Sequence, residues 1–250
     1  MRLIPVLDLL NGVVVRGVAG QRESYRPVQS QIVDTAEPLD VARAFRKHFG
    51  LETLYVADLD AILHNRPNLE TYTQLAAAGF AISVDAGIHD IQSAEAILQT
   101  GVDSVIAGLE STPAPHFLEE LIARCGSSRI VFSLDLKHGQ PLSSSPAWDG
   151  LSAFQIAQSV LACGVRRMIV LDLAQVGIST GITTLPLCSE IQMLAEDETA
   201  SKLELITGGG VRDARDLDSL AQAGIDGVLI ASAFHNGKLT RDDVEHTNFR

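Results

Sequence analysis

Two aspartates in similar sequence surroundings are the first candidates for catalytic residues in this chain. Asp8 lies in LIPVLDLLNG and Asp135 in IVFSLDLKHG, so each follows an apolar run and stands four residues before a glycine. They are 127 positions apart in a chain of 250 residues, close to half its length. If the fold brings them face to face, one carboxyl can take a proton while the other delivers one, which is general acid–base chemistry. An aspartate that only caps its own loop is the alternative at each position.

The same half-length spacing recurs in three other pairs of segments. VDAGIHD matches TGGGVRD, and GVDSVIAGLES matches GIDGVLIASAF, both at a separation of 123 residues. LYVADLDAI and MIVLDLAQV form the third pair, aligned on Asp58 and Asp172. Because all the pairs occur in the same order, the sequence predicts one domain, 1–250, built from two similar halves at about 1–126 and 127–250. Chance similarity among apolar segments is the alternative explanation.

Alternating strand and helix patterns indicate the architecture that must position these aspartates. Continuous apolar runs predict eight strands covered on both faces, at residues 2–7, 52–57, 80–84, 103–108, 129–134, 167–171, 203–207 and 226–231. Apolar residues at three-and-four spacing predict helices at residues 38–49, 68–79, 90–101, 116–126, 152–164 and 213–224. This alternation is typical of the α/β class and predicts a (β/α)8 TIM barrel. A doubly wound open sheet is the alternative, but no G-x-G-x-x-G motif follows the first strand.

The predicted barrel gives the two aspartates a common location. Active sites of such barrels lie at the C-terminal ends of the strands. Asp8 and Asp135 end the first and fifth predicted strands, which stand opposite each other in a ring of eight. We therefore expect both carboxyl groups to face one cavity at the barrel mouth.

Composition limits the partners of the protein. Lys and Arg number 19 against 31 Asp and Glu, and the formal net charge of −12 disfavours binding to nucleic acid phosphates. Three widely spaced cysteines without a C-x-x-C pattern indicate a reducing cytoplasm rather than a disulfide framework or a zinc site. No apolar run approaches membrane-spanning length. We expect a cytoplasmic protein without a nucleic-acid or membrane partner, and the oligomeric state is left open.

A run of glycines, Gly208, Gly209 and Gly210, ends the seventh predicted strand, and Ser232 follows the eighth in LIASAF. Successive glycines let backbone N–H groups approach an anion, and a helix N-terminus adds a favourable dipole. The loops after the last two strands frequently form a phosphate site in barrels of this kind. These segments therefore predict a phosphorylated small-molecule partner. A tight turn that needs glycine for its backbone alone is the alternative explanation.

The chain resembles the histidine-biosynthesis isomerase family over essentially its whole length, in the segments PVLDLLNGVVVRGVAG, LYVADLDAI, FSLDLK, AWDGLS, TGGGVRD and VLIASAF. Members of that family include ProFAR isomerase and a related cyclase subunit. The resemblance implies an Amadori rearrangement of an aminoaldose to an aminoketose without a cofactor, with Asp8 as general base and Asp135 as general acid. The acid helps to open the ribose ring by protonating its oxygen, and the base then removes the C2 proton. The resemblance also implies phosphate binding by the glycine run with Ser232, and a substrate contact by Trp148.

Three departures from the family pattern affect the expected substrate. The third predicted strand ends in VDAGIHD, where Asp85 and Ala86 replace two glycines of a second phosphate loop. Glu110 follows the fourth strand in place of a small neutral residue. After the sixth strand, a valine precedes Gly177, where the family has an aspartate before the glycine. Gly177 is the residue of this loop that we expect to contact the substrate.

Asp85 limits how many phosphates can bind. A carboxylate about 5 Å from one phosphate charge is repelled by roughly 3 kcal/mol at an effective dielectric of about 20. We therefore expect a substrate with one phosphate, whose other end, near Asp85 and Glu110, is an amine, a hydroxylated group or a divalent cation. In the alternative, Asp85 turns away from the mouth and caps the next helix.

Several alternatives for function remain open at this point. The departures are similar to a ProFAR-isomerase-related group of methanogens and of bacteria with methanopterin-linked C1 metabolism, which implies a link to C1-cofactor synthesis. A ProFAR isomerase of the histidine pathway is one alternative. A Schiff-base aldolase or condensing enzyme that uses Lys137 is another, and a non-catalytic phosphometabolite-binding protein is a third. Arg16, near the first long loop, could clamp an anionic substrate.

Aspartates at strand ends also raise the question of a metal. Carboxylate oxygens are ligands for Mg²⁺ and Ca²⁺, and six aspartates end predicted strands: Asp8, Asp58, Asp60, Asp85, Asp135 and Asp172. The usual spaced ligand loop is absent. We therefore expect no metal, and we expect Asp58 and Asp172 to orient loops.

Overall fold

Eight parallel strands close into a ring in the computed structural model of this chain, which describes residues 1–178, 181–198 and 202–248. The strands follow one another in chain order around the ring, and the last pairs with the first. They are β1 (Arg2–Leu10), β4 (Thr53–Asp58), β5 (Ala81–Asp85), β6 (Ser104–Gly108), β7 (Ile130–Lys137), β9 (Arg167–Asp172), β10 (Glu204–Gly208) and β11 (Gly227–Ile230). The predicted (β/α)8 barrel is confirmed.

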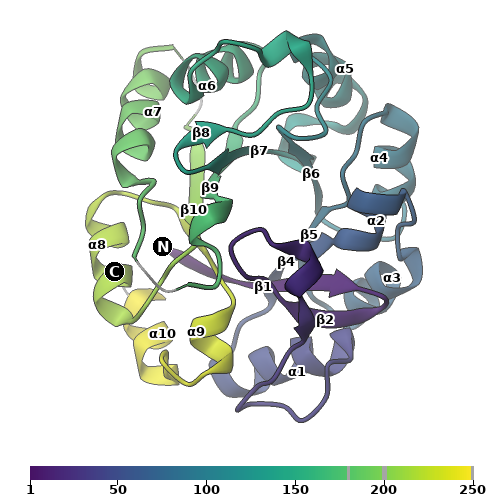
Figure 1. Ribbon diagram of the computed structural model, residues 1–250, viewed down its shortest axis with the longest axis vertical. Helices are drawn as coiled ribbons and strands as arrows, with labels where there is room; N and C mark the ends of the chain where they lie inside the picture. The colour runs from purple at the N-terminus through teal and green to yellow at the C-terminus, as the bar shows by residue number, and fades with distance from the viewer. Residues whose placement is uncertain (179–180, 199–201, 249–250) are drawn as a thin grey trace.

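Helices surround the ring on its outside (Figure 1). They are α1 (Pro38–Phe49), α2 (Leu59–His64), α3 (Leu69–Ala77), α4 (Ile91–Leu98), α5 (Pro115–Cys125), α6 (Ala153–Ala162), α7 (Leu185–Glu198), α8 (Ala214–Gln222), α9 (Ser232–His235) and α10 (Arg241–Asn248). The sequence did not predict α7, because its apolar residues are spread around the helix rather than along one face. Within the described ranges, every helix is too short or too polar to cross a bilayer.

Alternation along each strand separates two apolar cores. On β1, Leu3 and Leu7 pack between strand and helices, whereas Ile4 and Val6 belong to a smaller cluster inside the ring. That inner cluster also contains Tyr55, Ala57, Ile106, Val131, Ile169, Leu171, Ile206 and Leu229. Because side chains alternate with a period of two, Asp8 shares the inward face of Ile4 and Val6. The same alternation turns Asp135 inward on β7.

The strand register repeats between the two halves of the ring. Asp8 on β1 lies beside Ala57 of β4, and Asp135 on β7 lies beside Leu171 of β9. Ala57 and Leu171 each precede the aspartate on which their segments align in the sequence. The first and fifth strands of an eight-stranded ring are opposite, so the repeated register places the two inward aspartates across the barrel from each other.

Short antiparallel strands extend the first and fifth barrel strands. β2 (Val13–Arg16) pairs with β1 and with β3 (Arg26–Pro27), and β8 (Gln140–Pro141) pairs with β7. Both extensions lie in the long segments that follow the first and fifth predicted strands. These segments lie at the end of the barrel where Asp8 and Asp135 emerge.

Asp58 lies on the helix-facing side of β4 and is fully buried. Its carboxylate accepts hydrogen bonds from the amides of Ala61 at 3.0 Å and Asn68 at 2.8 Å, and from the hydroxyl of Tyr72. Asp172, its counterpart on β9, accepts from the backbone amides of His138, Gly139 and Ala174. Both aspartates therefore orient loops, as the sequence predicted.

Asp58→Ala should lower the free energy of unfolding by about 2–4 kcal/mol, because it leaves three buried donors without their acceptor. Urea denaturation measures this loss, with Glu120→Ala on the exposed face of α5 as the control, expected within about 0.5 kcal/mol of wild type. An Asp58→Ala protein as stable as the control would contradict the structural role.

Candidate active site

A cavity of about 340 Å³ occupies the end of the barrel where the inward carboxyl groups lie. Asp8, Asp85 and Asp135 line it from three different strands, and Glu110 lines it from the loop after β6. The structure therefore brings the predicted acid–base pair into one enclosure with both acidic residues of the departures.

Asp8 is partly buried, and its carboxyl faces the cavity. Burial raises its pKa from the ordinary 3.8 to about 7, since the charged form loses its hydration; the Gly17 amide hydrogen bond opposes this rise, and the charge of Asp85 adds to it. Gly17 is required here, since a Cβ at this position would lie 2.7 Å from Asp8 Oδ2. A carboxyl with a pKa near neutrality is suited to exchange protons with a substrate.

Asp135 is buried on the opposite strand and is held by its own strand neighbour. Ser133 shares the inward face of β7 and donates its hydroxyl to Asp135 Oδ1 at 2.7 Å. Gly108 of β6 leaves room for the other oxygen, because a Cβ there would lie 3.3 Å from Oδ2. The carboxyl therefore has a fixed direction into the cavity.

Asp85 faces the cavity rather than the following helix. Its carboxylate accepts from the Tyr55 hydroxyl at 3.1 Å and from the Gly87 amide at 3.1 Å. Burial and the neighbouring charge of Asp85 raise the pKa of Tyr55 well above its ordinary value, so the phenol remains a hydrogen-bond donor. Asp90 caps α4 instead, so the alternative in which Asp85 caps that helix is wrong.

The glycine run lines the cavity with Gly209 and Gly210, and Ser232 lines it at the start of α9. Both glycines have positive φ, +80° and +88°, a backbone conformation that side chains rarely adopt. Gly208 stands behind them, and a Cβ there would lie 2.7 Å from Cβ of Leu229. Gly209 and Gly210 therefore expose backbone to the cavity, as an anion cradle requires, and Gly208 leaves room for the neighbouring Leu229.

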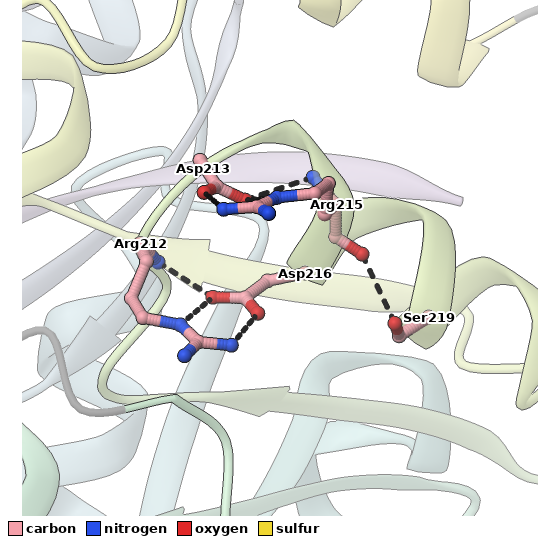
Figure 2. Close-up of polar contacts among 5 residues, drawn as sticks. All are labelled: Arg212, Asp213, Arg215, Asp216 and Ser219. Atoms are coloured by element: carbon pink, nitrogen blue, oxygen red, sulfur yellow. Dashed lines mark hydrogen bonds and ion pairs between the residues drawn. The ribbon is translucent and has the colours of Figure 1, made fainter.

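Paired charges hold the glycine cradle to α8 (Figure 2). Arg212 donates its backbone amide and two guanidinium nitrogens to the Asp216 carboxylate, at 2.7 to 3.0 Å. Asp213 caps α8 by accepting from the Arg215 amide at 3.0 Å. On its other side, Gly210 accepts a hydrogen bond from the Gly181 amide at 3.0 Å. The turn that presents the cradle is thus held from two directions.

The first long loop closes over the cavity against the loop after β9. The Ala19 amide donates to the Val176 carbonyl at 2.7 Å. Gly177 lies against Gly17, and a Cβ at position 177 would overlap the Gly17 carbonyl oxygen. Gly17 and Tyr25 of this loop line the cavity, so the contact with Gly177 forms part of the enclosure.

Comparison with known proteins identifies the family. Residues 2–240 match the sequence profile of the family described as histidine biosynthesis protein. The chain belongs to this family. It is 30% identical over 250 residues to an uncharacterised protein of Methanocaldococcus jannaschii, covering 98% of this chain and 97% of that protein.

Two further relatives are named as isomerases. The chain is 29% identical over 249 residues to the 1-(5-phosphoribosyl)-5-((5-phosphoribosylamino)methylideneamino)imidazole-4-carboxamide isomerase of Listeria innocua, covering 98% of this chain and 97% of the relative. It is 29% identical over 255 residues to a protein of the same name from Lactococcus lactis subsp. cremoris, covering 99% and 97%. Family membership therefore spans the whole barrel and not one half of it.

Trp148 lies outside the cavity of this histidine biosynthesis family member. It is 2% exposed, its Nε1 donates to the Thr112 carbonyl at 2.9 Å, and its ring packs near Phe132 with centroids 6.4 Å apart. The segment after β8 thus buries the indole against the outer core. Trp148 is not among the residues that line the cavity, and the substrate contact implied for it stays a prediction.

Arg16 and Lys137 also lie outside the main cavity. Arg16 is exposed and lines a smaller hollow of about 40 Å³, which shares Gly17 and Ser232 with the main cavity. Arg16 is therefore adjacent to the serine of the predicted phosphate site. Lys137 is exposed and pairs with Gln140 in the β7–β8 hairpin. Its side chain does not line the cavity in which a Schiff base with the substrate would form.

Sequence reasoning missed two tyrosines of the cavity lining, Tyr25 and Tyr55. Tyr55 carried a usable signal, because it stands two residues before inward Ala57 on the same strand. Nothing in the sequence pattern indicated that Tyr25 lines the cavity, because it lies in a long loop whose path depends on tertiary contacts.

The aspartates at strand ends do not form one metal-binding group. Asp58 and Asp172 face the helices, whereas Asp8, Asp85 and Asp135 face the cavity. Among the described residues, no three His, Cys, Asp or Glu side chains stand close enough to hold a metal ion.

Asp8→Asn should stabilise the protein at high pH. The folded-state pKa of about 7 exceeds the ordinary 3.8, so the folded state keeps a proton that the unfolded state releases between these pH values. Stability from this group is complete below about pH 4 and is lost as pH rises to about 7, by up to about 4 kcal/mol. We expect the variant to gain about 1–3 kcal/mol at about pH 8 and almost nothing at about pH 4, measured by urea denaturation. An equal gain at both pH values would show that the buried charge is not the cause.

Gly177→Ala should separate the two loops over the cavity, because its Cβ would overlap the Gly17 carbonyl oxygen. Trypsin cleavage after Arg16, which is exposed and precedes Gly17, should then be about tenfold faster, since local opening exposes the loop. Gly139→Ala is the matched control. The φ of Gly139, +76°, is close to that of Gly177, +74°, so both substitutions strain the backbone alike, but a Cβ at position 139 would have nothing within 4 Å. Equal cleavage rates in the two variants would rule out the loop contact as the cause.

Proposed function

We propose that this protein is an isomerase that converts a phosphorylated aminoaldose into the corresponding aminoketose. The observation that carries the proposal is the placement of Asp8 and Asp135 on opposite strands of one cavity that also contains a glycine cradle. Membership of the histidine biosynthesis protein family and the isomerase names of two relatives support it.

The proposed reaction uses each carboxyl once as a proton donor or acceptor. The substrate phosphate binds at Gly209, Gly210 and Ser232. Asp135 protonates the ring oxygen, the C1–O bond breaks, and the nitrogen lone pair forms an iminium. Asp8 then removes the C2 proton to give an enolamine, and the ketose forms when C1 gains a proton and the C2 hydroxyl loses one. The pKa of Asp8, about 7, suits a base that works near neutral pH.

For the substrate, we propose a phosphorylated metabolite related to ProFAR and linked to C1-cofactor metabolism. Asp85 supports a substrate other than ProFAR, because it places a carboxylate where a second phosphate would bind. The similarity to the methanogen group and the 30% identity to the Methanocaldococcus jannaschii protein support the metabolic link. We place the reaction in the cytoplasm, on the basis of three cysteines that form no disulfide.

Asp8→Asn and Asp135→Asn should each lower turnover by about 10²–10⁴-fold, because each removes one proton transfer. The assay uses ProFAR, and aminoaldoses formed in solution from ribose 5-phosphate and primary amines. Nuclear magnetic resonance in D₂O measures the product, which carries deuterium at C1 because the proton taken from C2 exchanges with solvent.

Lys137→Ala is the control and should retain wild-type turnover, since this lysine lies outside the cavity. Loss of activity in Lys137→Ala, with activity retained in either aspartate variant, would favour the Schiff-base alternative. Binding of these phosphates without turnover by the wild type would favour a non-catalytic binding protein.

A further inference from the structure

The cavity lining has an uneven distribution of charge. It includes the four acidic residues Asp8, Asp85, Glu110 and Asp135, whereas no Lys, Arg or His is among the lining residues that the structure describes. A phosphate can bind through backbone N–H groups without a basic side chain. Several carboxylates around one enclosed space, by contrast, are complementary to a positively charged ligand group.

The internal repeat shows that the acidic character belongs to one half of the barrel. Asp85 in VDAGIHD corresponds to Gly208 in TGGGVRD, and Glu110 in GVDSVIAGLES corresponds to Ala233 in GIDGVLIASAF. The same two positions therefore carry acids in the first half and small neutral residues in the second. One end of the cavity presents carboxylates, and the other presents the backbone of Gly209 and its neighbours.

Two hydrogen-bond donors orient the carboxyl group of Asp85 at the acidic end. Asp85 accepts from the Tyr55 hydroxyl and the Gly87 amide, and both bonds favour a carboxylate over a neutral carboxyl group. The charges of Asp85, Asp135 and Asp8 all raise the pKa of Tyr55, so the three carboxyl groups lie near its hydroxyl.

Two tyrosines, Tyr25 and Tyr55, line this same cavity. Aromatic rings attract ammonium groups as well as apolar ones, through the negative faces of their π-systems. They are an observation separate from the carboxylates, and both kinds of side chain favour the same ligand chemistry.

We propose that the substrate is a phosphomonoester that carries a protonated amine in addition to the nitrogen that forms the iminium. Its phosphate lies at Gly209, Gly210 and Ser232, and its ammonium group lies between Asp85, Glu110 and Tyr55. This inference rests on the proposed function, because it assigns the two ends of the same site.

Isothermal titration calorimetry with the whole protein tests this assignment. The probes are inorganic phosphate, a series of linear aminoalkyl phosphates of increasing chain length, and the matching hydroxyalkyl and alkyl bisphosphate series. The series covers different spans, so a poor fit of one length does not decide the result. We expect the best amine to bind at least about tenfold more tightly than the matching alcohol, through attraction to the carboxylates.

Variants locate the source of that preference. Asp85→Asn and Glu110→Gln should each reduce the amine-to-alcohol affinity ratio by about threefold or more. Both should leave the affinity for inorganic phosphate at the wild-type value, because the cradle belongs to the other end. Glu120→Gln, on the exposed face of α5, is the matched control and should leave the ratio unchanged.

The outcomes separate this inference from the proposed function. Equal binding of amines and alcohols, or tightest binding of the bisphosphates, overturns the amine assignment and leaves the phosphate cradle intact. An amine preference that survives in both acid variants also overturns it. If neither inorganic phosphate nor any phosphomonoester binds, the phosphate site fails, and the proposed function fails with it.

Discussion

The closed ring of parallel strands is the constraint on which the site depends. In such a ring each strand must turn alternate side chains inward, and its neighbours fix its register. Asp8 and Asp135 share the inward face with the apolar residues of the inner cluster, and their equivalent registers set them on opposite strands. A shift of either strand by one residue would turn its aspartate toward the helices. The pairing of strands thus determines the chemistry available at the mouth.

Enclosing carboxyl groups in one cavity has an electrostatic consequence. Burial and the nearby Asp85 charge raise the pKa of Asp8, so the property that suits it to proton transfer also opposes folding as the group ionises. Hydrogen-bond donors hold two other carboxyl groups of the cavity in place: Ser133 donates to Asp135, and Tyr55 donates to Asp85. Under the proposed function, proton transfer and stability therefore compete at Asp8, whereas the three donors to Asp58 contribute to stability.

The two halves share a backbone plan and differ in what they present to the cavity. In the second half, glycines with positive φ expose backbone, and the Arg212–Asp216 pair holds their turn to α8. In the first half, Asp85 occupies the position equivalent to Gly208. An arrangement with two like ends suits a substrate with two like groups. The present one has unlike ends and suits a substrate whose ends differ in charge.

From the residue order alone, the barrel, the strand positions and the pair of strand-end aspartates could be predicted, because apolar runs and repeated segments can be read directly from the chain. The glycine run and the acids of the first half were visible in the same way. The burial of Trp148, the position of Tyr25 in the cavity lining and the inward direction of Asp85 became known from the tertiary structure. These outcomes depend on how long loops pack against distant strands, and such contacts leave no periodic signal in the chain.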